Sequence, residues 1–104
     1  MKSKSMFEKV IDLESNTILI LGQEYTINND KDALDRIDSM GLCDTAEQAI
    51  TLNQHHNRNF RSSILLHESI HAIDNALAIN LTEDQVMALG SSLYIYLKEN
   101  GLLS

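Results

Sequence analysis

Residues 64–73 read Ile-Leu-Leu-His-Glu-Ser-Ile-His-Ala-Ile, and this stretch decides the fold of the chain. Apolar residues recur around it at i, i+4, i+7 and i+11, which is the spacing of one helical stripe: Leu66, Ile70, Ile73 and Leu77. The pattern predicts a helix from Asn59 to about Asn80, with Asn80 as a left-handed terminator. His67 and His71 lie off the stripe, so we expect them to face a different surface from the main core contact.

The two histidines and the glutamate between them have the spacing of a metal site. Residues four apart on a helix lie on one face with Cβ atoms about 5–6 Å apart, so His67 and His71 can direct imidazole nitrogens at one Zn²⁺. Glu68 lies one step round the helix, beside the open coordination position. Zinc lowers the pKa of bound water from about 15.7 towards about 7, and a carboxylate there can take its proton. The alternative is a pair of helix histidines bonded to backbone or water, with Glu68 solvated.

A third ligand is needed, because a catalytic zinc keeps three protein ligands whereas a structural zinc has four, usually including cysteine. Cys43 is the only thiol, so the catalytic pattern is favoured. We expect Glu83 to be this ligand, since it opens the next predicted helix on the face that should pack against the histidines. That face continues at helical intervals through Val86, Gly90, Leu93 and Leu97. The alternative for Glu83 is complementation of the helix dipole, worth about 0.3–1 kcal/mol.

Other polar residues near the motif leave alternatives open. Asp84 is the next candidate for the third ligand. Asp74 shares the histidine face, but three ligands along one straight helix would spread over about 10 Å, so a hydrogen bond from a histidine Nδ1–H to Asp74 is expected instead. His55 and His56 precede the helix in a polar stretch, where either could come close to the metal or to a substrate.

Two β-prone runs, 16–21 and 24–28, flank the dipeptide Gly22-Gln23 and predict a hairpin with a two-residue turn. Before it, residues 5–14 place three apolar side chains at helical spacing: Met6, Val10 and Leu13. After it, residues 29–40 are acidic and polar and predict a loop or one short helix.

A second hairpin is predicted from residues 41–44, a polar turn at 45–48, and residues 49–53, whose alternation is typical of a strand with one buried face. Its last strand leads into the histidine helix.

The sequence Thr-Glu-Asp-Gln at 82–85 is a capping box, and it predicts a last helix through about Lys98. Within that helix Tyr94 is expected in the core and Tyr96 at the surface, although a tyrosine hydroxyl could also stabilise an oxyanion. Strands followed by helices indicate an α+β fold, with a small N-terminal sheet before the two helices.

Length and charge narrow the class of protein. At 104 residues the chain is expected to form a single domain over 1–104. The net charge of −7, with only Arg58 and Arg61 close together, argues against a nucleic-acid groove. The longest apolar runs are too short to cross a bilayer, and no apolar signal follows the basic residues at 1–4, so we expect a cytoplasmic protein with no membrane partner. Cys43, the only cysteine, agrees with that compartment and is expected to be a small buried or half-buried apolar residue.

These segments together resemble a known group, the small phage- and prophage-borne zinc peptidases of the ImmA/IrrE type within the gluzincins. The likeness centres on residues 66–73, with their HExxH motif, followed by 81–86. The upstream part is similar in three short segments: 22–27 with its Gly-x-x-Tyr-x-Ile pattern, 41–44 and 49–52. The resemblance covers roughly residues 16–99.

The resemblance implies a minimal zincin fold, in which a small twisted sheet accompanies an active-site helix and a second helix donates a glutamate. Carried over to this chain, it implies His67, His71 and Glu83 as zinc ligands and Glu68 as the general base. The activity implied is that of a zinc-dependent endopeptidase acting on a protein or peptide, and some members of the group cleave repressor proteins.

Two functions therefore follow as hypotheses. The first is an active zinc endopeptidase in which an edge strand at residues 50–52 holds the substrate by β-addition. The second is a non-catalytic zincin-scaffold module that binds a host or phage regulatory protein. Glu68→Gln separates the two, because only the first function depends on that carboxylate.

Overall fold

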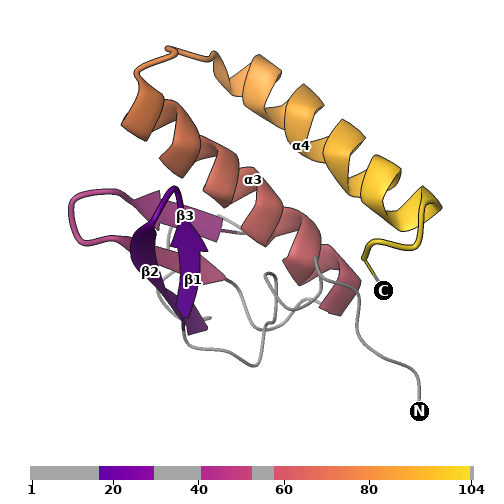
Figure 1. Ribbon diagram of the computed structural model, residues 1–104, viewed down its shortest axis with the longest axis horizontal. Helices are drawn as coiled ribbons and strands as arrows, with labels where there is room; N and C mark the ends of the chain where they lie inside the picture. The colour runs from indigo at the N-terminus through magenta and orange to yellow at the C-terminus, as the bar shows by residue number, and fades with distance from the viewer. Residues whose placement is uncertain (1–16, 30–40, 53–57, 104) are drawn as a thin grey trace.

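The computed structural model describes residues 17–29, 41–52 and 58–103, and it forms a small α+β domain (Figure 1). The strands are β1 (Thr17–Ile20), β2 (Gln23–Asn29), β3 (Gly41–Asp44) and β4 (Ala49–Leu52), and the helices are α3 (Arg58–Leu77) and α4 (Glu83–Glu99). The α+β class predicted from the sequence is confirmed. The helical spacing at 5–14, the polar stretch after Asn29, and His55 and His56 lie outside the described residues.

Both predicted hairpins are present. β1 pairs antiparallel with β2, and β3 pairs antiparallel with β4. The first turn is one residue earlier than predicted, because Ile20 pairs with Gln23 and leaves Leu21 and Gly22 as the turn. Both have positive φ angles, 51° and 80°, as a type I′ turn requires.

The two hairpins join through a parallel pairing of β2 with β4, so the strand order is β1-β2-β4-β3. This order contradicts the prediction that residues 50–52 form an edge strand, because β4 is paired on both sides. Ile50 and Leu52 are fully buried, as suits an internal strand. The edge strand next to the helices is β3.

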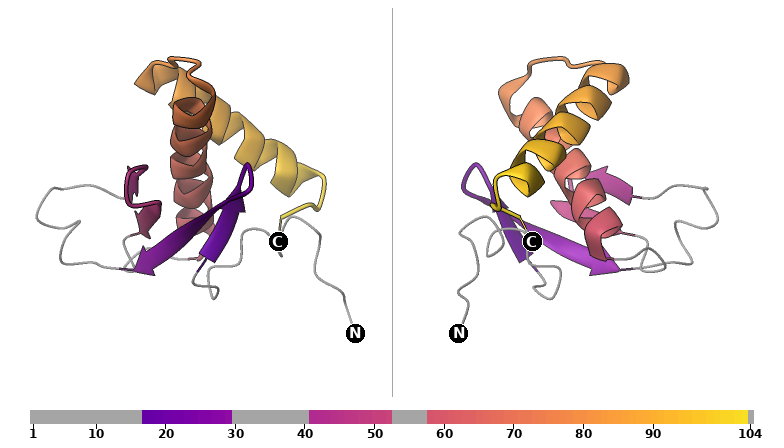
Figure 2. Two further views of the ribbon diagram at one scale, coloured as in Figure 1. Left: turned by 60° about the vertical axis from the view of Figure 1, so that its left-hand side comes forward. Right: turned by 90° about the vertical axis from the view of Figure 1, so that its right-hand side faces the viewer.

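One face of the sheet packs against α3, and α4 packs against α3 in turn (Figures 1 and 2). Alternate strand residues form the core on that face: Ile18, Ile20, Tyr25, Ile27, Ile50 and Leu52. From α3, Leu65 is fully buried among them, and Ile64 and Ala72 complete the cluster. Helix α3 is therefore covered on two sides.

The predicted stripe on α3 is only partly correct for this reason. Ile70 is buried, Leu66 and Ile73 are half-buried against the core, and Leu77 is 58% exposed at the end of the helix. Because the sheet and α4 contact different faces of α3, no single stripe defines its buried surface.

Helix α4 buries most of the face predicted for it. Val86, Gly90 and Leu97 are buried, whereas Leu93 is 41% exposed. Tyr96 is exposed as predicted, and Tyr94 is half-buried instead of lying in the core.

The helix ends agree with the sequence at one position and differ at another. The capping box is confirmed: the Gln85 backbone N–H donates to Thr82 Oγ1 at 3.1 Å, and the Thr82 N–H donates to Gln85 Oε1 at 2.9 Å. Helix α3 stops at Leu77, where Ala78 takes a left-handed φ of 53° and the N–H of Ile79 donates to Asp74 O at 3.3 Å. This is a Schellman ending, so Asn80 (φ 69°) lies beyond the terminus that it was predicted to form. Neither described helix is long and apolar enough to span a bilayer.

Candidate metal centre

His67 and His71 lie one turn apart on the face of α3 that is neither in the sheet core nor fully covered by α4. Their rings meet edge to face, with centroids 4.9 Å apart and planes at 70°. Both side chains are half-buried, with 24% of the His67 side chain and 33% of the His71 side chain exposed. The i, i+4 spacing of the sequence produces this pairing directly.

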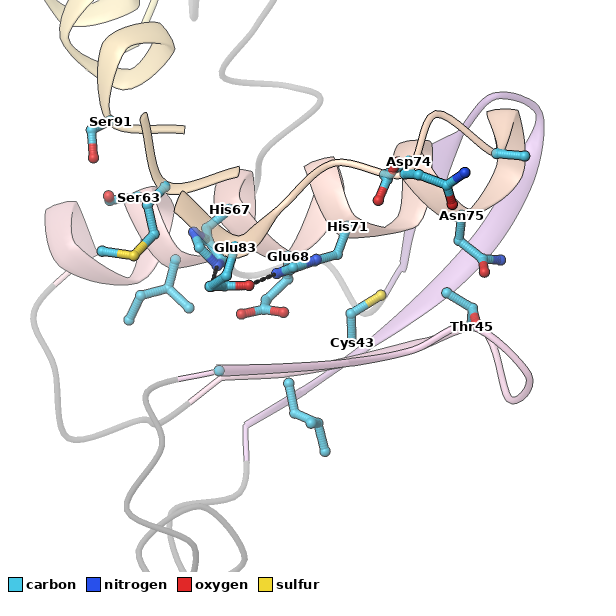
Figure 3. Close-up of a pocket in the computed structure, with 16 residues that line it drawn as sticks. Cys43, Thr45, Ser63, His67, Glu68, His71, Asp74, Asn75, Glu83 and Ser91 are labelled. Atoms are coloured by element: carbon cyan, nitrogen blue, oxygen red, sulfur yellow. Dashed lines mark hydrogen bonds and ion pairs between the residues drawn. The ribbon is translucent and has the colours of Figure 1, made fainter. Parts of the chain in front are cut away.

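Glu83 is the first residue of α4, and its carboxylate bridges the two imidazoles (Figure 3). Glu83 Oε1 lies 3.0 Å from His67 Nε2, and Glu83 Oε2 lies 3.0 Å from His71 Nε2. Because a carboxylate only accepts, each imidazole donates from Nε2 in this arrangement. The structure thus brings together the three residues predicted as ligands.

These three side chains have a donor set that fits zinc. One nitrogen from each histidine and one glutamate oxygen lie within 4.8 Å of one another. Zinc bonds of about 2.0–2.2 Å in a tetrahedral shell place neighbouring donors roughly 3.3–3.6 Å apart, so small movements of the side chains would complete the geometry. Two imidazoles and one carboxylate are also a donor set that catalytic zinc sites use.

The short connection between the helices positions Glu83. Asp74 Oδ1 accepts a hydrogen bond from the backbone N–H of Leu81 at 3.1 Å, which ties the last turn of α3 to the residue before the Thr82 cap. Asp74 was expected to accept from a histidine Nδ1, and the structure gives its carboxylate this backbone partner instead. The reason is the left-handed turn at Ala78, which folds the chain back over Asp74.

Asp84, the alternative ligand, does not join the cluster. Its side chain is exposed, and among the described residues the group able to hold a metal is His67, His71 and Glu83. One helical step separates Asp84 from Glu83, so only one of the two can face α3.

Glu68 lies beside the three candidate ligands and is buried, with only 8% of its surface exposed. Burial raises the pKa of its carboxyl above the ordinary value, His67 and His71 lower it in part, and the charge of Glu83 raises it again. Strand β3 passes close to this side chain: a Cβ added to Gly41 would lie 3.2 Å from Glu68 Oε2. The carboxyl is thus held between α3 and the edge strand.

An open cleft of about 910 Å³ runs along the site between β3 and α3, with the start of α4 on its other side. His67, Glu68, His71 and Glu83 line its middle part. Figure 3 shows Ser63 and Ser91 near one end of the labelled cluster and Thr45, Asp74 and Asn75 near the other.

No family model, curated protein or solved structure matches this chain. A buried carboxyl with a raised pKa, next to two imidazoles and a carboxylate at the floor of an open cleft, is suited to acid–base work on a bound molecule.

The cleft also contains residues to which the sequence assigned no place in the site. Gly41 and Cys43 line it from β3, and Thr45 follows at the end of that strand. Cys43 is half-buried as expected, but its neighbours include Glu68. Alternation along 41–44 indicates which residues share a face of the strand, yet only the position of β3 at the sheet edge shows that this face opens on the histidines.

Proposed function

We propose that this chain is a zinc-dependent metallo-endopeptidase that hydrolyses peptide bonds of a protein substrate. The observation that carries the proposal is the buried Glu68 carboxyl, which lies beside the His67–His71–Glu83 cluster and opens on the same cleft. A structural cluster would need no titratable side chain held at the surface of a cleft in this way. The likeness to ImmA/IrrE-type peptidases points to the same activity.

His67, His71 and Glu83 would hold the metal, two through Nε2 and one through a carboxylate oxygen. A Zn²⁺ bound there would supply Lewis acidity, which polarises a carbonyl and lowers the pKa of water. Each histidine would bind the metal through an Nε2 lone pair, so bonds to the metal would replace the hydrogen bonds between the imidazoles and Glu83.

Glu68 would act as the general base and then as the general acid. It takes a proton from the attacking water while the oxygen bonds to the peptide carbonyl carbon. It then delivers that proton to the amine nitrogen as the C–N bond breaks, so the carboxylate is regenerated. A raised pKa favours both steps, because such a carboxyl accepts and returns a proton nearer to neutral pH than an ordinary one.

Strand β3 is the element that would hold the substrate. The sequence predicts this role for residues 50–52, but these residues lie inside the sheet, and β3 is the edge strand next to α3. An extended peptide that adds to the β3 side of the sheet would run along the cleft past Glu68. Gly41 allows β3 to lie close to α3, because it places no side chain between the strand and the helix.

The test uses the full chain purified without added metal and then loaded with zinc. We expect about one zinc per chain by elemental analysis, and cleavage of a mixed peptide library detected by mass spectrometry. Glu68→Gln should keep the metal and lose roughly 10²- to 10⁴-fold in turnover. Glu83→Gln should weaken zinc binding by more than the roughly 10- to 100-fold that loss of an outer-shell partner costs.

Glu99→Gln is the matched control, because Glu99 is an exposed glutamate at the far end of α4. It should bind zinc and cleave peptides as the native chain does. Cleavage that persists unchanged in Glu68→Gln would contradict the proposal. A zinc-loaded chain that cleaves nothing, and whose biological effect survives Glu68→Gln, would instead identify the non-catalytic binding module.

A further inference from the structure

The two ends of the cleft differ in chemistry. Beyond His71 the lining is mostly polar and carries a negative charge: Thr45, Asp74, Asn75 and Asn80, with Ala78 among them. Before His67 it contains two apolar side chains, Ile64 and Met87, with two serines, Ser63 and Ser91. Among the described lining residues, a peptide lying along the cleft would therefore meet a carboxylate beside the site on the Asp74 side of the reacting bond only.

Asp74 is the carboxylate at that end, and the proposed reaction does not use it. Glu83 would be neutralised by the metal, and Glu68 would carry the proton. Asp74 is half-buried, lines the cleft, and uses Oδ1 to accept from the Leu81 N–H. A carboxylate has acceptor capacity beyond one hydrogen bond, so Asp74 can also meet a cationic side chain.

No arginine or lysine is among the described residues that line the cleft. Arg61 bonds to the side chain of Asn29 on another part of the molecule, and Lys98 lies in the last turn of α4. Asp44, at the end of β3 before Thr45, adds negative charge: it contributes to raising the pKa of Cys43, which lines the cleft. Among the described residues, the charges at the Asp74 end of the cleft are therefore negative, and no arginine or lysine lining the cleft offsets them.

The distance along the helix sets where a substrate residue would meet Asp74. At about 1.5 Å per residue, Asp74 lies roughly 7–8 Å along the α3 axis from the midpoint of the histidine pair. An extended peptide advances about 3.3 Å per residue, so this is about two residues from the reacting bond. A long side chain extends that reach to about three residues.

We infer that the cleft selects peptides that carry a lysine or arginine within about three residues of the cleaved bond, on the Asp74 side. This inference rests on the proposed function and names the substrate class of the same site. Arginine and lysine are the side chains that pair with a half-buried carboxylate at this position. An acidic residue there would be disfavoured by Asp74 and Asp44 together.

Binding to the zinc-loaded Glu68→Gln chain tests the inference without turnover. The probes are fluorescein-labelled decapeptides, identical except for one position that carries Lys, Gln or Glu and is moved along the peptide, with fluorescence anisotropy as the measurement. At one position, the peptide with lysine should bind about three- to tenfold more tightly than the peptide with glutamine, and the peptide with glutamate should bind more weakly still. The preference should shrink as salt is raised from 20 to 500 mM, because the pair is only half-buried.

Asp74→Asn, introduced into the same Glu68→Gln chain, is the deciding variant. An asparagine Oδ1 can still accept from Leu81 N–H, so the connection to α4 is kept while the charge is removed. The lysine preference should disappear in this variant and persist in the Glu99→Gln control. Asp74→Asn in the otherwise native chain should likewise remove the lysine preference from library cleavage.

Equal binding of the three peptide series, or a lysine preference unchanged by Asp74→Asn, would overturn the inference while peptide cleavage still supports the proposed function. A zinc-loaded chain that neither binds nor cleaves any peptide would overturn both.

Discussion

Gly41 lets strand β3 lie close to helix α3, at the place where Glu68 is buried. A Cβ at this position would stand 2.4 Å from Ile64 Cγ2 and 3.3 Å from Glu68 Cγ. Ile64 is buried and its Cγ2 cannot swing away freely, so we predict that Gly41→Ala lowers the free energy of unfolding by about 1–3 kcal/mol. Chemical denaturation followed by circular dichroism measures this loss.

Gly90→Ala is the matched control for that substitution. Its added Cβ would meet His67 Cα at 3.6 Å and Ile70 Cδ1 at 3.6 Å, which are ordinary contacts. Alanine also favours a helix interior over glycine by about 1 kcal/mol, so this variant should be more stable than the native chain. If both alanines destabilise the chain equally, the close approach at Gly41 is not what sets the outcome.

The thiol of Cys43 reports on the charge of the cleft. Burial raises its pKa to about 11, and the negative charges of Glu68 and Asp44 contribute. Only the thiolate reacts with iodoacetamide, so we predict an alkylation rate that climbs about tenfold per pH unit from pH 7 to 10 without levelling off. Glu68→Gln should move the whole curve to lower pH, because one of the charges that oppose the thiolate is gone.

The alkylation rate is measured by mass spectrometry of the intact chain at each pH. An ordinary cysteine with a pKa of about 8.5 would level off above pH 9, and that shape would contradict the burial of Cys43. Glu99→Gln should leave the curve where it is.

For single residues, the sequence predicts which side chains share a face of one helix, but it does not predict the contacts that a turn brings about. His67 and His71 are four apart on a regular helix, so their shared face follows from spacing alone. Glu83 was expected from the face of the next helix, and the structure brings it to both imidazoles. The partner of Asp74 could not be predicted, because the backbone N–H of Leu81 reaches it only through the left-handed turn at Ala78.

The element boundaries show a similar division. The capping box at Thr82 and Gln85 is a local pattern, and the structure confirms it. The turn of the first hairpin was misplaced because two turn positions, Leu21-Gly22 and Gly22-Gln23, keep the same apolar side chains on the core face. Shifting a hairpin turn by one residue changes the partners across the strands by two positions, which preserves the inward alternation. Burial alone therefore cannot choose between them.

The end of α3 carries a prediction of its own. Ala78 occupies the left-handed position of a Schellman ending, with φ of 53°, where glycine is usual. An L-residue with a Cβ is strained by about 1–2 kcal/mol in this conformation, and glycine removes that strain. Glycine also makes the unfolded chain more flexible, which offsets part of the stabilisation. We predict that Ala78→Gly raises the free energy of unfolding by about 0.5–1 kcal/mol, measured by urea denaturation.

Ala76→Gly is the control, because Ala76 is an exposed residue two positions earlier in the right-handed helix. The same change there should destabilise by about 1 kcal/mol. Two variants of equal sign would contradict the left-handed ending at Ala78.

For the molecule as a whole, the parallel pairing of β2 with β4 is the feature that local patterns could not show. Both hairpins follow from short-range alternation and turn residues, but their union joins Ile27 to Ile50 across a long stretch of chain. That pairing places β4 inside the sheet and β3 at the edge beside α3, and so decides which strand faces the candidate metal site. A peptide that added to this edge of the sheet would therefore meet the backbone of β3 and not that of β4.

The proposed ligands come from two elements, and this links metal binding to the stability of the whole domain. His67 and His71 belong to α3 and Glu83 to α4, so a bound zinc would hold the two helices together.

A metal that binds only the folded chain stabilises it by RT ln(1 + [L]/Kd), about 4 kcal/mol at a free concentration 1,000 times Kd. For a domain of this size that corresponds to a rise in Tm of about 15 °C or more, and chelation with EDTA should reverse it. Glu83→Gln should lose most of the rise while Glu99→Gln keeps it, with differential scanning calorimetry as the measurement. A rise of equal size in Glu83→Gln would mean that the metal is not held between the helices, because that variant leaves both histidines on α3 in place.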